Sequence, residues 1–592
     1  MDKQTIGGFL LIALVLMIWM WIQVPPPGSK TTTRVDSTKQ ETHVKEVSPA
    51  PSPVVPKETG RDSLGKFFSH LAAGREKVVT IKTDLYTAEI STKGGLIRSW
   101  ELTRFKTWRH DPVELVDYDH GGDFSILFTT SDGRLINTRN LDFTGTFPRS
   151  IELSGDDTYT IDLILPVSET KRLTKRYVFT NGKYSFSTTM IFENLEDVIA
   201  NYEYQIVWEH GLNYAERNSV NESSYAKAYA FSGGELAEID ATSASEPANR
   251  DFNGATSWVA TRNKYFAVAM LPEDGNCQGV YMHGEHHPQP DKGVKETYSI
   301  GLKMPFKGGA VEKSTLTVFI GPLDFAIVKS YGRNLENIMT LGAAWIIRPI
   351  TEYVMIPLFT FLKMLIPNFG IVIIVFSIII KVVLHPLSRT SMQSMKKMQA
   401  LQPMMEEIRQ KHKDDSQKMN QQLMNLYKEY GVNPAAGCLP LIIQLPILYA
   451  LYSIFSSSIE LRQAEFVAWI TDLSVPDIVA TLPVAIPIFS ITEVSGLALA
   501  IGVTMFVQQK MTVTDPRQKT MVWMMPILMT LLFNGFPSGL NLYYFVFNLL
   551  SIAQQSLVNK RHAQEPLRKV DPKKSAGGIL GRLTKDLPKL NR

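Results

Sequence analysis

The sequence contains very little cysteine and none of the short motifs that mark nucleotide or metal chemistry. Only Cys277 and Cys438 occur in 592 residues, the first in a polar turn and the second at the start of an apolar segment. A disulfide between them is not expected, and no zinc-binding or redox spacing is present. The chain also has no P-loop, no GxGxxG fingerprint and no HExxH. We therefore predict neither nucleotide hydrolysis nor any other enzymatic activity.

Acidic residues are missing from five long apolar runs in the second half of the chain. These runs cover residues 369–387, 437–458, 495–511, 520–536 and 539–557. Runs of this length and composition are typical of helices that span a bilayer. We therefore predict a polytopic α-helical membrane protein whose helical core lies within residues 366–558.

A sixth apolar run opens the chain within residues 1–24. It leads directly into Pro25, Pro26 and Pro27 instead of a small-residue cleavage site, so we predict an uncleaved transmembrane anchor. Residues 25–76 are rich in Pro, Ser, Thr and Lys, a composition typical of a flexible linker. The anchor and the five later runs together give six predicted transmembrane helices.

Residues 77–322 contain no spanning run and instead alternate apolar and polar residues with a period of two. Many short strands separated by Gly, Asp and Asn turns are typical of an all-β sandwich. Asn181-Gly182 stands between two alternating stretches, which is a strong local signal for a β-hairpin. We expect this domain outside the membrane plane, where it serves structure or partner docking; carbohydrate binding is the alternative.

Lys and Arg are distributed unevenly among the segments between the apolar runs. Residues 388–436 carry eight and residues 559–592 carry ten, whereas residues 459–494 carry only Arg462 beside five acidic residues. Cytoplasmic loops are the ones that accumulate Lys and Arg. We therefore place the first two segments in the cytoplasm, the third outside, and both termini inside.

The segment 342–365 is apolar but is interrupted by Arg348, Pro349, Glu352 and Lys363. It either spans the bilayer or lies in its interface as an amphipathic helix. A second crossing at this point would place the β-sandwich in the cytoplasm. We therefore prefer the interfacial helix.

Lys381 is a cation inside the apolar run 369–387. Ser377, Lys381, His385 and Ser388 follow each other at intervals of four, four and three residues, which places them on one side of a helix. Burying a cation in hydrocarbon costs roughly 2.5–3.5 kcal/mol or more, so an intramembrane Lys marks a candidate functional site. The alternative is a Lys that extends along its helix to the membrane interface and has no further role.

A second polar stripe runs along the last predicted span. It consists of Asn541, Tyr544, Asn548, Ser551 and Gln555, at intervals of three and four residues. Gln444 lies within another span, and polar residues of this kind also form ordinary contacts between helices. So many of them around a cation without an acidic partner favour a water-filled cavity open to the cytoplasm. The candidate groove residues are Ser377, Lys381, Gln444, Tyr543, Tyr544 and Asn548.

A polar helical hairpin is predicted within residues 388–432, with arms over Thr390–Lys413 and Gln417–Tyr430. Asp414-Asp415-Ser416 supplies a turn and an N-cap between them. Methionine suits adaptable apolar contacts, and the basic surface suits RNA or anionic lipid. Candidate contacts to a client or a ribosome are Met395, Lys396, Lys397, Met398 and Met405. The alternative is that the methionines only hold the two arms together.

An amphiphilic groove suits a passing polypeptide, because polar residues can travel through its wet part while apolar residues slide into lipid. A coupling carboxylate, a broken-helix ion site and an inverted repeat, which a secondary transporter would need, are not detectable in the sequence. Two other classes of protein stay open. One is a small-solute channel or transporter, and the other is a glycan-binding envelope protein that acts through the β-sandwich.

The membrane half contains the stretches IIIKVVLHPLSRTSMQSMKKMQALQP, LYKEYGVNPAAGCLPLIIQLPI and FPSGLNLYYFVFNL, and the sandwich contains EISTKGGLI, WVATRNKYFAVAML and STLTVFIGP. These stretches closely resemble the YidC-type bacterial membrane protein insertases of the Oxa/Alb superfamily. The resemblance implies a core of five spans, an N-terminal anchor and the periplasmic β-supersandwich of the Gram-negative form. It also implies a hydrophilic groove that is open to the cytoplasm and to the bilayer.

The same resemblance implies a function and partners. Such a protein inserts nascent inner-membrane proteins and helps them fold, alone or with the Sec translocon, and needs no cofactor or metal. Its helical hairpin receives clients, and its basic tail helps to hold the ribosome. Two departures stand out: the groove cation, usually Arg in the family, is Lys381 here, and the loop 475–494 is longer than in the enterobacterial pattern.

Overall fold

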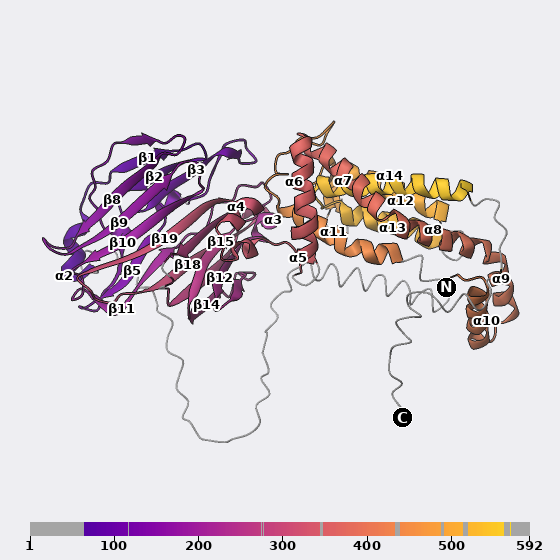
Figure 1. Ribbon diagram of the computed structural model, residues 1–592, viewed down its shortest axis with the longest axis horizontal. Coiled ribbons are helices and arrows are strands. Elements are labelled where there is room, and N and C mark those ends of the chain that lie inside the picture. Colours follow the sequence, from indigo (N-terminus) through magenta and orange to yellow (C-terminus); the bar gives the residue numbers. More distant parts are fainter. Residues whose placement is uncertain are drawn as a thin grey trace, which may run out of the picture. The chain divides into compact units, whose positions relative to one another are not determined.

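The structure is a computed structural model of the 592-residue chain (Figure 1). It describes residues 64–116, 118–273, 275, 277–343, 347–432, 439–486, 491–512, 519–561 and 569. The chain divides into two compact units between Met339 and Thr340. The predicted anchor 1–24 and most of the basic tail 559–592 lie outside the described residues.

The first unit consists mainly of strands. They are β1 Val78–Lys82, β2 Tyr86–Ser91, β3 Ile97–Lys106, β4 Pro112–Glu114, β5 Ser125–Thr130, β6 Leu135–Asn137, β7 Ser150–Glu152, β8 Thr158–Pro166, β9 Arg172–Thr180, β10 Ser185–Glu193, β11 Ile199–Trp208, β12 Lys227–Ser232, β13 Glu235–Ile239, β14 Ala248–Asn253, β15 Thr256–Arg262, β16 Phe266–Pro272, β17 Gly279–Pro288, β18 Val294–Pro305 and β19 Val311–Pro322. Short helices accompany them: α2 Gly65–Phe68, η2 Ser69–Ala72, α3 Ser219–Ser223, α4 Phe325–Ser330 and η6 Leu335–Ile338.

These strands form three sheets. The order is β13-β12-β15-β16-β19-β10-β9-β8 in the largest, β14-β17-β18-β11-β5-β6 in the second and β4-β3-β2-β1-β7 in the third. Apolar side chains at alternating positions fill the space between the sheets, and Trp100, Trp208 and Trp258 are completely buried there. The prediction of a β-sandwich is therefore confirmed.

The predicted hairpin at Asn181-Gly182 joins β9 to β10, which pair from Phe179 and Phe186 outward. Gly182 has a φ of 74°, a left-handed conformation that glycine adopts without strain. The Asn181 side chain accepts a hydrogen bond from the backbone N–H of Asp84 at 2.9 Å. The hairpin prediction is confirmed.

The first unit begins earlier than the sequence suggested. The predicted linker extends to residue 76, but helical turns cover residues 65–72. Phe68 is buried, and its ring centroid lies 5.5 Å from that of Phe128. Burial of one aromatic side chain is enough to draw the end of this polar segment onto the sandwich.

The side chain of Lys175 is completely buried inside the sandwich. Lys175 Nζ donates hydrogen bonds to the backbone carbonyls of Gly94, Gly95 and Phe124 at 3.0, 3.3 and 3.0 Å. Burial lowers the pKa of Lys175 to about 7. Because the three carbonyls come from residues before β3 and β5, the ammonium ties two loops to strand β9.

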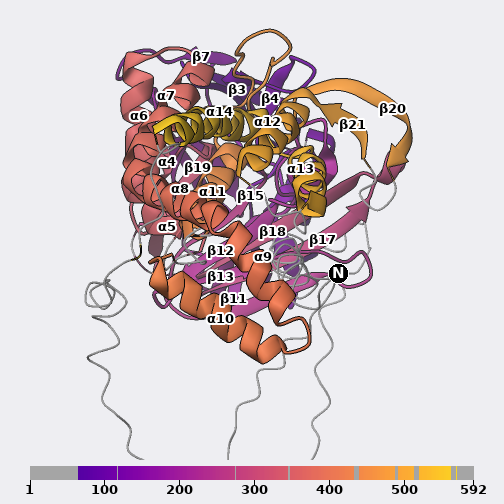
Figure 2. The same ribbon diagram turned by 90° about the vertical axis from the view of Figure 1, so that its right-hand side faces the viewer.

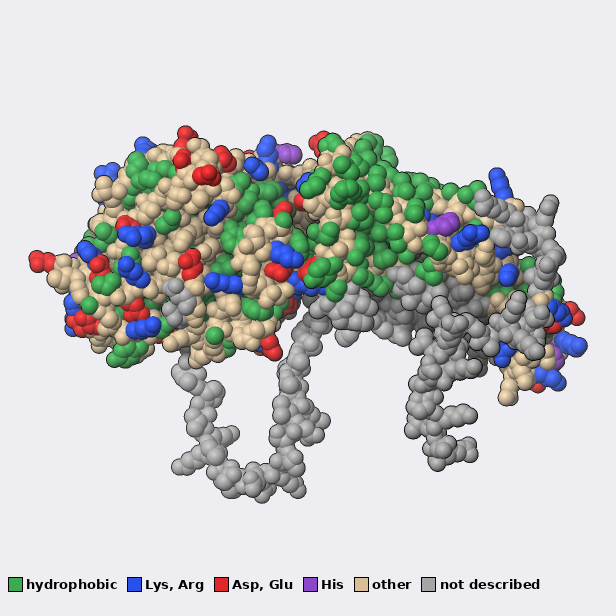
Figure 3. Space-filling view, in the orientation of Figure 1, with side chains coloured by type: hydrophobic (Ala, Val, Ile, Leu, Met, Phe, Trp, Pro, Cys, Tyr) green, Lys and Arg blue, Asp and Glu red, His purple; other side chains and the backbone are tan. Residues whose placement is uncertain are grey.

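The second unit consists mainly of helices (Figure 1). They are α5 Ile347–Ile350, a π-helical turn η7 Thr351–Met355, α6 Ile356–Leu365, α7 Phe369–Val383, α8 His385–Ala400, α9 Gln402–Lys411, α10 Ser416–Glu429, α11 Leu439–Ser457, α12 Gly496–Thr512, α13 Lys519–Phe533 and α14 Ser538–Arg561. Strands β20 Ile478–Ile486 and β21 Ile491–Ser495 precede α12. Hydrophobic side chains cover much of the visible face of α6 and α7 (Figure 3).

The predicted spans correspond to helices, although their limits differ. Among the described residues no single helix is both long and apolar enough to cross a membrane, whereas α7 and α8, bent by 62° at their junction, meet both conditions together. The sequence had suggested one continuous helix over 369–387. Pro386 lacks an N–H and its ring crowds the carbonyl four residues earlier, which explains the break at Leu384. The count of six spans stays a prediction.

Two further segments differ from expectation. The helix predicted over 342–365 begins at Ile347 among the described residues, and its Arg348–Glu352 ion pair joins α5 to the π-helical turn. Strands β20 and β21 pair in antiparallel fashion within residues 478–495, a pairing that the sequence analysis did not predict. Apolar runs interrupted by proline do not distinguish a strand from a loop in the sequence.

Candidate functional site

Lys381 lies near the C-terminal end of α7 and is almost completely buried, with 7% of its surface exposed. Asn368 caps the start of this helix by accepting a hydrogen bond from the N–H of Ile371 at 3.1 Å. The apolar side chains of α7 pack into one cluster with those of α11, α12 and α14. Packing of the helix therefore fixes the direction in which Lys381 points.

Two uncharged groups on α14 contact the Lys381 ammonium. Its Nζ donates a hydrogen bond to Ser551 Oγ at 2.6 Å and lies 4.4 Å from the centroid of the Phe547 ring. Ser551 Oγ in turn donates to the carbonyl of Phe547 at 2.8 Å. Helices α7, α11, α12, α13 and α14 contain no Asp or Glu. A hydroxyl and an aromatic face stabilise an ammonium without neutralising it.

The bend after α7 keeps the rest of the predicted stripe close to α14. Gln554 Nε2 donates to Ser388 Oγ at 3.1 Å and lies 3.3 Å from His385 Nδ1. Ser388, Ser551 and Gln554 are all buried. We refer to Lys381, His385, Ser388, Ser551 and Gln554 as the Lys381 cluster.

The polar stripe of α14 faces the interior of the helical unit, as its periodicity indicated. Asn541, Asn548, Ser551 and Gln555 are buried, and α14 packs against α7, α8, α11 and α12. Asn548 Nδ2 donates to Thr504 Oγ1 of α12 at 3.5 Å. One face of α14 thus carries polar contacts to α7, α8 and α12.

The other candidate groove residues have surroundings of their own. Ser377 Oγ donates to the carbonyl of Ile373 on its own helix at 2.7 Å, and the side chain is completely buried. Gln444 is half-buried on α11, and the Tyr544 ring packs against Phe533 at 4.8 Å. In the part of the chain that the structure describes, no hydrogen bond joins these three residues to Lys381.

Two buried polar atoms near this face have no hydrogen-bond partner among the described residues. They are Tyr543 Oη and Asn541 Oδ1, and both side chains are completely buried. A buried polar group without a partner costs about 1–3 kcal/mol. Such groups are usually paired with water or with a bound molecule.

The sequence indicated Lys381 but missed two residues that complete its surroundings. Phe547 and Gln554 lie four residues before and three residues after Ser551, on the same face of α14. Phe547 resembles any apolar residue of a span, so no signal singled it out. The spacing of Gln554 from Ser551 was a usable signal.

The helical hairpin consists of α8, α9 and α10 rather than two arms. Met405 is buried in a cluster with Leu401, Leu426, Tyr430 and Val432, and Met398 packs against that cluster. Asp415 caps α10 by accepting a hydrogen bond from Lys418 N–H at 2.9 Å, as predicted. Met405 thus occupies the position expected of a residue that holds the helices together.

The remaining hairpin candidates differ in their surroundings. Lys396 Nζ donates to the carbonyl of Asn559 near the end of α14 at 2.7 Å, where the helix dipole favours a cation. Met395 is half-buried, and Lys397 is exposed. Only Lys397 of these three is freely accessible to a client or a ribosome in this arrangement.

The first unit contains a polar cluster whose ligand atoms lie within 4.8 Å of one another, formed by Asp123, Glu209 and His210. Arg139 pairs with both carboxylates, and Asp123 also accepts hydrogen bonds from the backbone N–H groups of Glu209 and His210 at 2.7 Å. A metal ion would have to displace these donors. The cluster is therefore better explained as a structural network.

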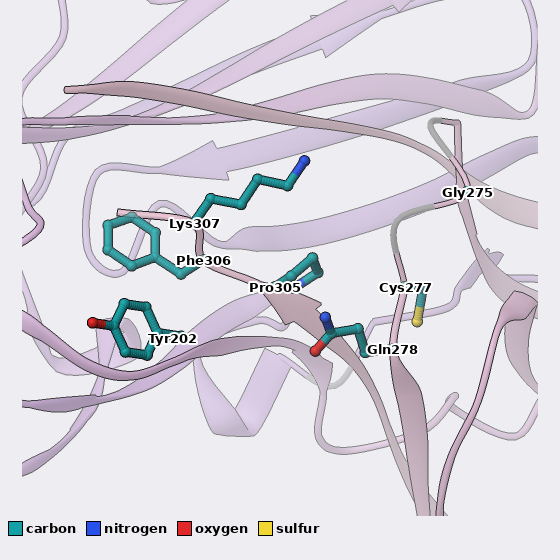
Figure 4. Close-up of a pocket in the computed structure, with 7 residues that line it drawn as sticks. All are labelled: Tyr202, Gly275, Cys277, Gln278, Pro305, Phe306 and Lys307. Carbon is teal, nitrogen blue, oxygen red and sulfur yellow. The ribbon is translucent and has the colours of Figure 1, made fainter. Parts of the chain in front are cut away.

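The first unit also has a hollow of about 530 Å³, lined by Tyr202, Gly275, Cys277, Gln278, Pro305, Phe306 and Lys307 (Figure 4). The Cys277 thiol is buried and donates to the carbonyl of Gly279 at 3.0 Å. Burial raises the pKa of this thiol, so it is a poor nucleophile. The lining offers no acid–base pair and no group of charges that would select a ligand.

Comparison with known proteins adds to this geometry. Residues 78–353 match the family described as YidC periplasmic domain, and residues 361–565 match the family described as 60Kd inner membrane protein. The chain is 37% identical over 566 residues to the membrane protein insertase YidC of Chlorobaculum tepidum, covering 94% of this chain and 95% of that protein.

A second relative agrees with this match, and one solved structure was also found to be similar. The membrane protein insertase YidC of Chloroherpeton thalassium is 36% identical over 577 residues, covering 96% of this chain and 97% of the relative. The crystal structure of an active YidC insertase with its first transmembrane domain resolved is 20% identical. It has a TM-score of 0.35 and covers 82% of this chain and 93% of the other.

Proposed function

This chain belongs to the YidC family of membrane protein insertases, and from that premise we propose that the Lys381 cluster receives the hydrophilic part of an entering client. The chain is a non-enzymatic inner-membrane insertase with a periplasmic domain, and its clients are nascent membrane proteins. The observation that carries the proposal is the 2.6 Å hydrogen bond from the buried Lys381 Nζ to Ser551 Oγ.

The Lys381 ammonium can still donate hydrogen bonds to a client and attract its negative charges. It carries three N–H donors, of which the Ser551 hydroxyl accepts one while the Phe547 ring faces the charge. Neither partner carries a negative charge, so an acidic group in a passing segment gains the full charge–charge attraction. At the effective dielectric near a protein surface this attraction is worth up to about 4 kcal/mol at 4 Å.

Water is the second component of the proposed groove. The unpartnered Tyr543 Oη and Asn541 Oδ1 support hydration of the interior face of α14. A hydrated path lowers the cost of moving polar groups from the cytoplasm into the bilayer, which would otherwise be several kcal/mol per unpaired group. Burial of the client's apolar residues in lipid then drives insertion.

The position of the cluster supports entry from the cytoplasmic side. Lys381 is two residues before the end of α7, about 3 Å along the helix axis. The cluster continues through His385 and Ser388 onto α8, which is the first helix of the basic helical hairpin. In the predicted topology, with six spans and both termini in the cytoplasm, this end of α7 faces the cytoplasm.

The cytoplasmic helices supply the first contact in this proposal. Met424 on α10 is 50% exposed, and Lys397, Lys413 and Lys418 are exposed as well. Exposed Met beside basic residues suits an apolar nascent segment and the anionic surface of a ribosome. The basic tail 559–592 provides further charge for ribosome binding, and the Sec translocon is a proposed partner for larger clients.

Site-specific photocrosslinking to a stalled nascent chain tests the proposal. A crosslinking amino acid at Ser377, Lys381, Gln444 or Tyr544 is expected to capture a single-span client during insertion. Matched controls lie on the opposite faces of the same helices: Val383 on α7 is 67% exposed, and Leu549 on α14 is 44% exposed.

Strong capture from positions 381 and 544 with weak capture from 383 and 549 would support a groove on the interior face. Equal capture from both faces would mean that clients slide along the outer surface of the helices, and the proposal would be wrong.

A further inference from the structure

The loop 475–494, which the predicted topology places outside the membrane, contains two paired strands that are almost free of charged residues. Strands β20 and β21 pair with each other as a separate two-stranded sheet, from Ile478 opposite Ser495 to Ile486 opposite Ile491. The two strands together contain a single charged residue, Glu493. Figure 2 shows them extending away from helices α12 and α13.

The base of this hairpin is firmly attached to the helical unit. Asp477 Oδ2 accepts hydrogen bonds from Trp469 Nε1 at 2.9 Å and from the backbone N–H of Leu497 at 2.8 Å. Its Oδ1 accepts from Ser495 Oγ at 2.5 Å, and Asn534 Oδ1 accepts from Ser495 N–H at 2.9 Å. The hairpin therefore leaves the first turn of α12 in a defined direction.

Both faces of the hairpin expose apolar side chains. Successive strand residues point to opposite faces, and Ile478, Val479 and Val484 are 37%, 47% and 77% exposed. No third strand pairs with either edge in the described part of the chain. A two-stranded ribbon of this kind is marginally stable in water, and an exposed apolar edge invites aggregation. The β20–β21 ribbon is therefore not expected to be stable when it is fully exposed to water.

The exposed apolar surface continues from the hairpin onto α12. Leu499 and Val503 on this helix are 48% and 64% exposed, as expected of a lipid-facing span. Trp469 and Val479 lie beside Gly496 at the start of α12, where an added Cβ would come within 3.0 and 2.9 Å of them. Trp469 is 53% exposed, and tryptophan is enriched at the boundary between membrane and water.

The backbone limits how deeply the hairpin can enter the bilayer. Open strand edges carry N–H and C=O groups that hydrocarbon cannot satisfy, so they are not found in the hydrocarbon core. Pro483 removes one such donor from β20 but leaves the others. Apolar side chains with an unpaired backbone match the interfacial region, where both lipid chains and water are within reach.

We propose that strands β20 and β21 lie in the outer interfacial region of the bilayer and contact lipid through Ile478, Val479 and Val484. The β20–β21 hairpin thereby anchors the outer end of α12, independently of any client. The partner is the lipid bilayer itself and not a second protein strand added to the free edge.

Depth-dependent fluorescence quenching of the full-length protein in phosphatidylethanolamine–phosphatidylglycerol vesicles tests this proposal. In a Cys277→Ser, Cys438→Ser background, Val484→Cys carries an environment-sensitive fluorophore. Val503→Cys on α12 serves as the lipid-facing reference. Val311→Cys, 58% exposed on strand β19 of the periplasmic unit, serves as the water-facing reference.

Spin-labelled lipids should quench the fluorophore at 484 strongly, and a label near the headgroup should quench it more than a label near the chain end. Iodide should quench it several-fold less than at 311. Iodide quenching equal to that at 311, without lipid quenching, would place the hairpin in water and overturn the proposal. A fluorophore shielded from both quenchers would show that protein covers the strands, and would overturn it as well.

Discussion

Lys381 on α7 and Ser551 on α14 lie 170 residues apart in the sequence and are joined by a hydrogen bond of 2.6 Å inside the helical unit. The bond brings together two polar stripes that the sequence showed separately. It also gives the buried ammonium a partner that holds its position and leaves its charge uncompensated. The insertase function proposed for the Lys381 cluster depends on this combination.

Replacement of Ser551 tests the contribution of this bond to stability. Ser551→Ala removes the acceptor of a buried ammonium, so we expect the free energy of unfolding in detergent to fall by about 1–3 kcal/mol. Ser377→Ala is the matched control, because that hydroxyl is equally buried but only bonds a carbonyl of its own helix. Thermal unfolding measures both. In a Lys381→Met background the effect of Ser551→Ala should largely disappear, and full additivity would contradict the pairing.

The buried Lys175 predicts a pH dependence of the periplasmic unit. Burial lowers its pKa from 10.5 to about 7, so between these values the unfolded chain binds a proton that the folded chain has released. Stability attributable to this group therefore rises with pH in that window, by at most about 1.4 kcal/mol per pH unit. Unfolding free energies can be measured by tryptophan fluorescence between pH 7 and 10. Their slope against pH should be more positive for the natural protein than for Lys175→Met. Identical slopes would rule out this linkage.

Asp477 is expected to be a stability determinant of the helical unit. Asp477→Ala leaves Trp469 Nε1 and the N–H of Leu497 without their acceptor, at an expected cost of about 2–4 kcal/mol in unfolding free energy. The control is the half-buried Asp472, whose carboxylate accepts hydrogen bonds from the N–H and the Oγ of Ser474. Asp472→Ala should cost about 1 kcal/mol. A larger loss for Asp472→Ala in thermal unfolding would contradict this account.

Two methionines of the helical hairpin should behave differently. Met405→Ala removes a buried side chain and should destabilise α9 and α10 by about 2–4 kcal/mol, visible as faster hydrogen exchange in residues 402–429. Met424→Ala, at a half-exposed position, should change stability by less than about 0.5 kcal/mol but reduce crosslinking of the hairpin to a client. Reduced crosslinking with Met405→Ala and a loss of stability with Met424→Ala would contradict these roles.

Local patterns in the sequence predicted much of the architecture. Asn181-Gly182 marked a hairpin because few dipeptides adopt its backbone angles, and Asp415 marked a helix start because its carboxylate accepts a free N–H. The intervals along α14 predicted which face is buried. Each of these signals depends on neighbours within one turn or one helix.

Features that depend on how separate elements pack could not be predicted in the same way. The choice of Ser551 and Phe547 as partners of Lys381 depends on the rotation of α7 against α14. The bend at Leu384 was indicated by Pro386 but was not expected, because the apolar run continues through it. Strands β20 and β21 have the composition of a loop or a span, and only their pairing defines them.

The Lys381 charge is the central claim, and its most direct test is the insertion of a single-span client with an acidic exported tail. Lys381→Arg keeps the charge and should keep most of the insertion, whereas Lys381→Ala should lower it roughly tenfold, equivalent to about 1.4 kcal/mol. Lys510→Ala, at the exposed end of α12, is the control and should have no effect. Insertion of a client with a neutral tail should be the same with Lys381→Ala as with the natural protein. Equal insertion of the acidic client by the natural protein, Lys381→Arg and Lys381→Ala would contradict an electrostatic role for Lys381.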